Sequence, residues 1–81
     1  MEHIEPIKYA WDELNGIAQE QLTQAIEKHR QVEPGLGFPF AFWTEWSIEL
    51  GESMCVEYYV PDENRTHWYH YKKNGDHWEW W

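Results

Sequence analysis

A chain of 81 residues with fifteen acidic side chains against six Lys and Arg has a formal net charge of −9 and room for one domain, over residues 1–81. This charge argues against direct binding to nucleic acid, because phosphates would be repelled, and equally against an anionic membrane surface. A single Cys excludes an intramolecular disulfide, so the core must draw on seven Trp, five Tyr and three Phe. We expect a cytoplasmic protein, since the first residues contain no apolar run of a secretory signal and one thiol suits a reducing compartment.

Residues 6–32 predict an amphipathic helix. Apolar and aromatic positions recur at three- and four-residue steps and so share one stripe, made of Ile7, Trp11, Leu14, Ala18, Leu22, Ala25 and His29. Acidic side chains fall on the opposite face at seven-residue spacing, at Glu13, Glu20 and Glu27. An alternative is that Asn15-Gly16 splits the segment into a short helix and a longer one beginning near Ile17, and residues 7–11 also alternate like a strand.

A connector rich in Pro and Gly over residues 33–39 precedes two segments that alternate like strands. In residues 42–50 the apolar side consists of Trp46, Ile48 and Leu50. In residues 54–60 it consists of Met54, Val56, Tyr58 and Val60. We expect a three-residue hairpin loop over residues 51–53 to join them.

The C-terminal aromatic hairpin is the clearest local signal in the chain. Asn74-Gly75, typical of a two-residue turn, lies between aromatic runs at residues 67–73 and 76–81. That turn makes Tyr71 face Trp78 and Tyr69 face Trp80, on the side that the helix covers. The predicted fold is therefore α+β: one N-terminal amphipathic helix packed on one face of a three- or four-stranded antiparallel β-meander.

Requiring the apolar sides of the strands to coincide leaves acidic and aromatic side chains together on the opposite, outer face. The predicted register arranges them in three rows across the strands. The first row is Ser47, Glu57, His70 and Glu79; the second is Glu45, Tyr59, Trp68 and Trp81; the third is Glu49, Cys55, Lys72 and His77. Adjacent exposed aromatic side chains typically mark a contact site.

The sequence predicts no catalytic site, no metal site and no cofactor. No spacing of His and Cys matches a structural zinc pattern, and no Gly-rich phosphate loop or calcium loop is present. Cys55 shares its predicted row with Lys72 and His77, which would lower its pKa. A flat sheet with one helix nevertheless offers no deep pocket for a substrate, so we expect a binding protein rather than an enzyme.

Aromatic rings at the centre with carboxylates at the rim would suit a basic protein surface. Carboxylates on alternate strand residues are about 6.6 Å apart and those along the helix about 10 Å apart, so they can engage several Lys and Arg that otherwise bind phosphates. We predict an inhibitor or decoy that occupies a nucleic-acid-binding surface of a partner. The predicted contact residues are Glu45, Glu49, Glu57, Glu79, Tyr59, Trp68, Trp81, Glu13, Glu20 and Glu27.

In size and charge such a chain is similar in general character to the anti-restriction and anti-CRISPR inhibitors carried by phages, without a shared motif. Two alternatives stay open. One is a homodimeric structural or adaptor module whose row of Tyr59, Trp68 and Trp81 packs against a second copy. The other is an immunity protein that neutralises a toxin through the same electrostatic attraction.

Overall fold

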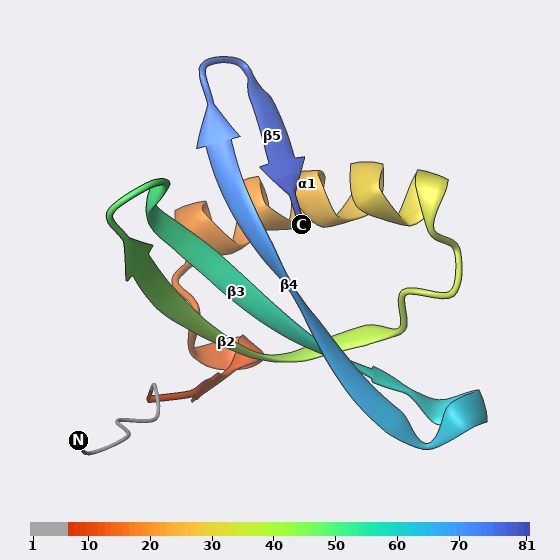
Figure 1. The fold of residues 1–81 in the computed structure, drawn as a ribbon. Coiled ribbons are helices and arrows are strands. Elements are labelled where there is room, and N and C mark those ends of the chain that lie inside the picture. Colours follow the sequence, from red (N-terminus) through yellow and green to blue (C-terminus); the bar gives the residue numbers. More distant parts are fainter. Residues whose placement is uncertain (1–6) are drawn as a thin grey trace.

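The computed structural model describes residues 7–81 and shows an α+β fold with one α-helix and a five-stranded antiparallel sheet (Figure 1). In chain order the elements are β1 (Tyr9–Ala10), the 3-10 turn η1 (Trp11–Glu13), α1 (Gly16–Val32), β2 (Phe38–Ser47), β3 (Gly51–Val60), the 3-10 turn η2 (Pro61–Glu63), β4 (Arg65–Asn74) and β5 (His77–Trp80). The strands lie in the sheet in the order β1-β2-β3-β4-β5. The predicted fold class is confirmed, but the sheet has five strands rather than three or four, and a strand precedes the helix.

The predicted single helix over residues 6–32 is wrong in its first third, and the alternatives of a break at Asn15-Gly16 and of a strand within residues 7–11 are confirmed. α1 begins at Gly16 because Asn15 caps it: the Asn15 side-chain oxygen accepts a hydrogen bond from the Ala18 backbone N–H at 3.2 Å. Before the cap, the chain forms β1, in which Tyr9 pairs with Phe42 at the sheet edge. The predicted start at residue 6 lies outside the described residues.

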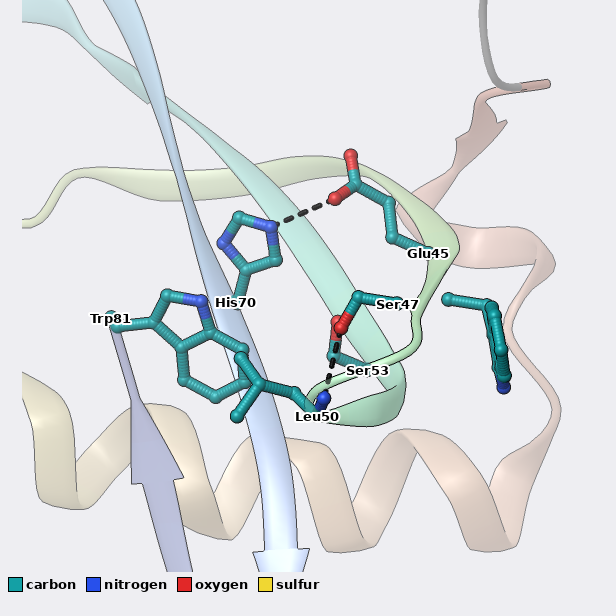
Figure 2. Close-up of a pocket in the computed structure, with 7 residues that line it drawn as sticks. Glu45, Ser47, Leu50, Ser53, His70 and Trp81 are labelled. Atoms are coloured by element: carbon teal, nitrogen blue, oxygen red, sulfur yellow. Dashed lines mark hydrogen bonds and ion pairs between the residues drawn. The ribbon is translucent and has the colours of Figure 1, made fainter.

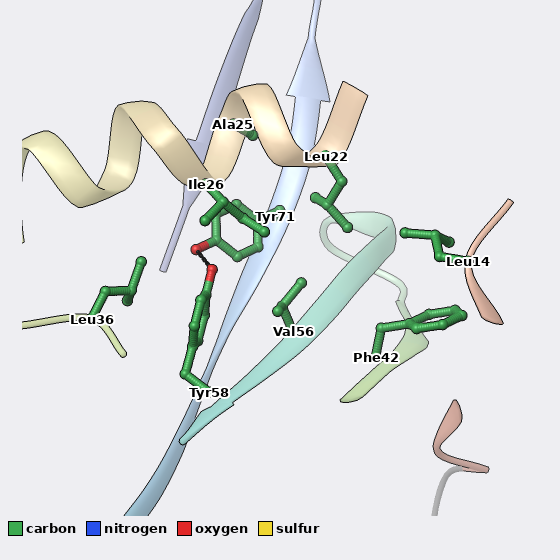
Figure 3. Close-up of a cluster of buried hydrophobic side chains, with 9 residues drawn as sticks. All are labelled: Leu14, Leu22, Ala25, Ile26, Leu36, Phe42, Val56, Tyr58 and Tyr71. Atoms are coloured by element: carbon green, nitrogen blue, oxygen red, sulfur yellow. Dashed lines mark hydrogen bonds between the residues drawn. The ribbon is translucent and has the colours of Figure 1, made fainter. Parts of the chain in front are cut away.

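α1 packs on one face of the sheet and buries the part of the predicted stripe that lies within the helix (Figures 1 and 3); Trp11 and Leu14 of that stripe precede α1. Its buried side chains are Leu22, Ala25, Ile26 and His29. They meet Val56, Tyr58 and Tyr71 of the central strands in the hydrophobic core. Ile7, which the pattern placed on the same stripe, is exposed because it precedes the helix. No helix in residues 7–81 is long and apolar enough to cross a membrane.

The hairpin between β2 and β3 turns earlier than predicted. β2 starts at Phe38, inside the expected connector, and ends at Ser47, so the loop is residues 48–50 rather than 51–53. The Ser47 hydroxyl accepts a hydrogen bond from the Leu50 backbone N–H at 3.0 Å, and Gly51 closes the loop at φ +74. Trp46, Ile48 and Leu50 are consequently exposed, and their predicted place in the core is wrong.

The C-terminal hairpin forms with a register two residues away from the predicted one. Asn74 pairs with His77 across a Gly75-Asp76 turn, so Tyr71 faces Trp80 rather than Trp78. A shift of two residues keeps each side chain on its own face, because side chains alternate with a period of two. The predicted inner face is therefore confirmed, and its rings pack in or against the core: Tyr69, Tyr71, Trp78 and Trp80.

Candidate outer-face site

The outer face of the sheet, opposite α1, carries the exposed rings that the sequence placed there. The exposed fraction is 39% for Tyr59, 55% for Trp68 and 42% for Trp81. These rings do not form one row across the strands, however. Trp68 lies opposite Glu57, and Tyr59 lies opposite Thr66. The predicted aromatic row is thus wrong, although its members share the predicted face.

The row at the centre of the outer face is Trp43, Cys55, His70 and Trp81. Trp43 pairs with Cys55, Cys55 pairs with His70, and the backbones of His70 and Trp81 exchange two hydrogen bonds. The His70 ring stacks on Trp81 with centroids 5.1 Å apart and an interplanar angle of 4°. The Trp43 ring lies 6.4 Å from that of Trp68. Trp43 was absent from the predicted contacts, although its alternation with Glu45 already placed it on this face.

Cys55 and His70 of this row lie close to Glu45, which belongs to the neighbouring row. The Glu45 carboxylate accepts hydrogen bonds from Trp43 Nε1 at 3.0 Å and from His70 Nε2 at 2.9 Å. These bonds, that from Trp43 first, lower the pKa of Glu45 and keep it ionised at neutral pH. The ligand-capable atoms of Glu45, Cys55 and His70 all lie within 4.8 Å of one another.

The Cys55 thiol is fully buried beneath this cluster. Burial, reinforced by the neighbouring Glu45 carboxylate, raises the pKa of Cys55 to about 12. The expectation of a lowered pKa is wrong because neither Lys72 nor His77 shares its row. A protonated thiol is a poor nucleophile, so the trio of Cys, His and Glu is not arranged for thiolate catalysis in this state.

A shallow cavity of about 130 Å³ adjoins the cluster. Its lining combines polar side chains with the tip of the β2–β3 hairpin: Glu45, Trp46, Ser47, Leu50, Ser53, His70 and Trp81. Figure 2 shows Glu45 and His70 in contact on one side and Trp81 beside His70. This volume is below the roughly 300 Å³ of a typical small-molecule pocket, and it suits an ion or a few waters.

The acidic residues predicted for the outer face have different surroundings. Glu45 and Glu79 are exposed there, and Glu49 is exposed in the hairpin turn, off the sheet. Glu57 is only 8% exposed, because its carboxylate pairs with Lys8 Nζ at 3.1 Å. Its prediction as an open contact residue is therefore wrong.

One of the three predicted acidic residues of the helix lies outside it. Glu13 lies in η1, where its carboxylate accepts a hydrogen bond from the Ala10 backbone N–H at 2.9 Å. Glu20 and Glu27 are exposed on the side of α1 away from the buried Leu22. The helix carboxylates and the outer sheet face therefore point to opposite sides of the molecule, and one flat partner surface cannot contact both.

A second hollow, of about 410 Å³, lies near the C-terminal end of α1. Two of its polar side chains have partners: Tyr69 donates a hydrogen bond to Glu33 Oε1 at 2.7 Å, and His67 Nε2 lies 2.7 Å from the Leu36 carbonyl, whereas the buried Glu33 Oε2 has no hydrogen-bond partner within residues 7–81. Asp62 and Arg65 complete its charged rim. It lacks a convergent, ligand-ready set of atoms, so the outer face is the stronger candidate.

Comparison of the chain with protein-family models, curated proteins and solved structures found no match. We therefore infer a function from the chemistry of the outer face. That face offers exposed aromatic area, ionised carboxylates and one small polar cavity, which together suit binding of a partner.

Proposed function

We propose that this protein binds a basic surface of a partner protein through its outer sheet face and inhibits the partner by occupying that surface. The observation that carries the proposal is the exposure of Tyr59, Trp68 and Trp81 on a sheet face that no helix or strand of residues 7–81 covers. Exposed clustered aromatic side chains are the residues that most often supply the binding energy of protein interfaces.

Charge supports a basic partner. Glu45 and Glu79 occupy the two ends of one sheet row, with Ser53 and Lys72 between them. Across three strand spacings the two carboxylates are about 14 Å apart. Their row lies directly beside the row that contains Trp43, His70 and Trp81. The net charge of −9 adds a long-range attraction that speeds encounter with a cationic surface.

The more specific proposal is a cytoplasmic decoy that displaces nucleic acid from its partner, of the phage anti-restriction or anti-CRISPR type. Its support is the small size of the chain and its acidic charge. An immunity protein would use the same face and differs only in the partner, a toxin. The homodimeric alternative is less favoured, because two chains that each have a net charge of −9 repel each other.

The test begins with capture of a partner from the native host by the immobilised chain, followed by mass spectrometry and binding measurements with the purified partner. We expect the affinity to fall steeply with salt and labelled duplex to be displaced. Trp68→Ala should weaken binding by roughly tenfold or more, and Glu79→Gln should mainly slow association. The control is the double variant Glu20→Gln/Glu27→Gln on the helix, which should leave the dissociation rate unchanged and slow association only through the loss of two net charges.

Two results would contradict the proposal in different ways. If the helix double variant lost binding while the Trp68 and Glu79 variants kept it, the interface would be α1 rather than the sheet. If the partner were captured but continued to hold duplex, the decoy function would be wrong while the binding face remained.

A further inference from the structure

Three adjacent strands each contribute one metal-ligating side chain to a single point of the outer face. Glu45 comes from β2, Cys55 from β3 and His70 from β4, and their oxygen, sulfur and nitrogen atoms lie within 4.8 Å of one another. Ligand atoms about 2.0–2.3 Å from a tetrahedral zinc ion are roughly 3.5 Å apart, so side-chain movements on the order of 1 Å would close the set.

We propose that Glu45, Cys55 and His70 form a zinc site with its fourth position open to water. Thiolate, imidazole and carboxylate are all zinc ligands, and three protein ligands with one water make a common zinc arrangement. No sequence spacing shows this set, because its members are ten or more residues apart and meet only through the strand register.

Neighbouring side chains already orient the proposed ligands. Trp43 Nε1 donates to one carboxylate oxygen of Glu45 at 3.0 Å, which turns the other oxygen toward His70. The His70 ring is held flat against Trp81, and Cys55 is fixed within the central strand. Such surrounding contacts hold ligands in place in established metal sites and strengthen binding.

The charge and volume of the site also suit a divalent cation. When Cys55 releases its proton to solvent on binding, the thiolate and the Glu45 carboxylate together balance the two positive charges of Zn²⁺. The adjoining cavity of about 130 Å³ has room for the water ligand. A bound ion would hold β2, β3 and β4 together beside Trp81, a structural role that needs no partner protein; it would occupy Glu45 and leave Glu79 as the carboxylate that attracts a basic surface.

The test is a titration of the full chain with Co²⁺ alone, followed by displacement with Zn²⁺. We expect one Co²⁺ per chain, a thiolate-to-cobalt charge-transfer band in the near ultraviolet and intense visible bands of tetrahedral cobalt. Cys55→Ser should abolish the charge-transfer band, and His70→Gln should weaken binding at least tenfold. The control is His77→Gln, since His77 is exposed on β5 and outside the cluster.

Because Cys55 is buried, its substitution can disturb the fold, so circular dichroism accompanies each variant. Glu45→Gln is the second ligand variant, at an exposed side chain, and it should weaken Co²⁺ binding while the fold persists. Absence of a charge-transfer band in the unmodified chain would overturn the proposal. So would a His77→Gln loss equal to that of His70→Gln, or normal binding by a folded Cys55 or Glu45 variant.

Discussion

His29 is held in the core at the centre of a chain of polar contacts. Its Nε2 lies 3.0 Å from a Glu33 oxygen, and its Nδ1 lies 2.5 Å from the Tyr71 hydroxyl. The Tyr71 hydroxyl lies 2.5 Å from that of Tyr58 (Figure 3). Burial raises the pKa of both tyrosines, so each keeps its proton. A neutral His29 with its proton on Nε2 lets Tyr58 donate to Tyr71 and Tyr71 donate to His29.

This arrangement predicts that the free energy of unfolding falls at acid pH because His29 becomes protonated. Burial lowers the pKa of His29 below 6.5, against the opposing pull of Glu33, while Arg30 and His67 lower it further. The unfolded chain therefore binds the proton more readily than the folded one. Stability should be full above pH 6.5 and should fall as the pH drops from 6.5 through the folded pKa, by at most about 1.4 kcal/mol per pH unit.

The measurement is urea unfolding between pH 8 and pH 5, compared with the variant His29→Gln. The difference between the two profiles isolates His29 from the carboxylates, which both chains share. A difference that stays constant across this range would show that His29 titrates alike in the folded and unfolded states.

The same chain of donors predicts unequal effects of two Tyr→Phe changes. Tyr58→Phe removes only the terminal donor and should cost about 0.5–1.5 kcal/mol of unfolding free energy. Tyr71→Phe leaves both the Tyr58 hydroxyl and His29 Nδ1 without their partner in the core, so it should cost a further 1–3 kcal/mol or so. Chemical denaturation measures both. Equal losses would contradict the proposed direction of the hydrogen bonds.

At the scale of elements, the approach to β2 depends on a glycine. Gly37 adopts φ +95, and a Cβ there would lie 2.5 Å from the Tyr59 carbonyl oxygen of β3. Gly37→Ala should therefore destabilise the fold by about 1–3 kcal/mol from backbone strain alone, with the steric clash in addition. Thermal and urea unfolding measure the loss.

The matched control lies two residues earlier in the same connector. A Cβ at Gly35 would meet nothing within 4 Å, and its φ is ordinary. Gly35→Ala should leave stability unchanged or raise it by up to about 1 kcal/mol, because it restricts the unfolded chain. Similar losses for both variants would mean that the connector as a whole, rather than the close approach at Gly37, limits the fold.

For the whole molecule, the proposed function predicts a monomer. A symmetric dimer through the outer face would bring together two chains that each have a net charge of −9. Light scattering at low ionic strength should give the monomer mass of 10.0 kDa. Twice that mass, with Trp81 fluorescence shifted to the blue, would support the homodimeric module instead.

For β3, β4 and β5, the sequence by itself determined which side chains face the helix and which face outward. Tyr69, Tyr71 and Trp80 lie inward and Trp68 lies outward, as alternation predicts. Side chains alternate with a period of two. A strand register that is wrong by an even number of residues therefore still places each side chain on the correct face of the sheet. The helix stripe from Ala18 to His29 was equally predictable from its spacing, and the alternative of a break at Asn15-Gly16 indicated where the helix begins.

Only the tertiary structure decided which side chains became neighbours across the strands. Ser47 faces Gly51 rather than Glu57, and Glu57 faces Trp68 rather than His70, so the predicted rows do not form. Register depends on where each hairpin turns and on what packs beneath it, and neither is encoded in the alternation of a single strand. For that reason the sequence could place Cys55 on the outer face but could not bring it together with its metal-ligating neighbours.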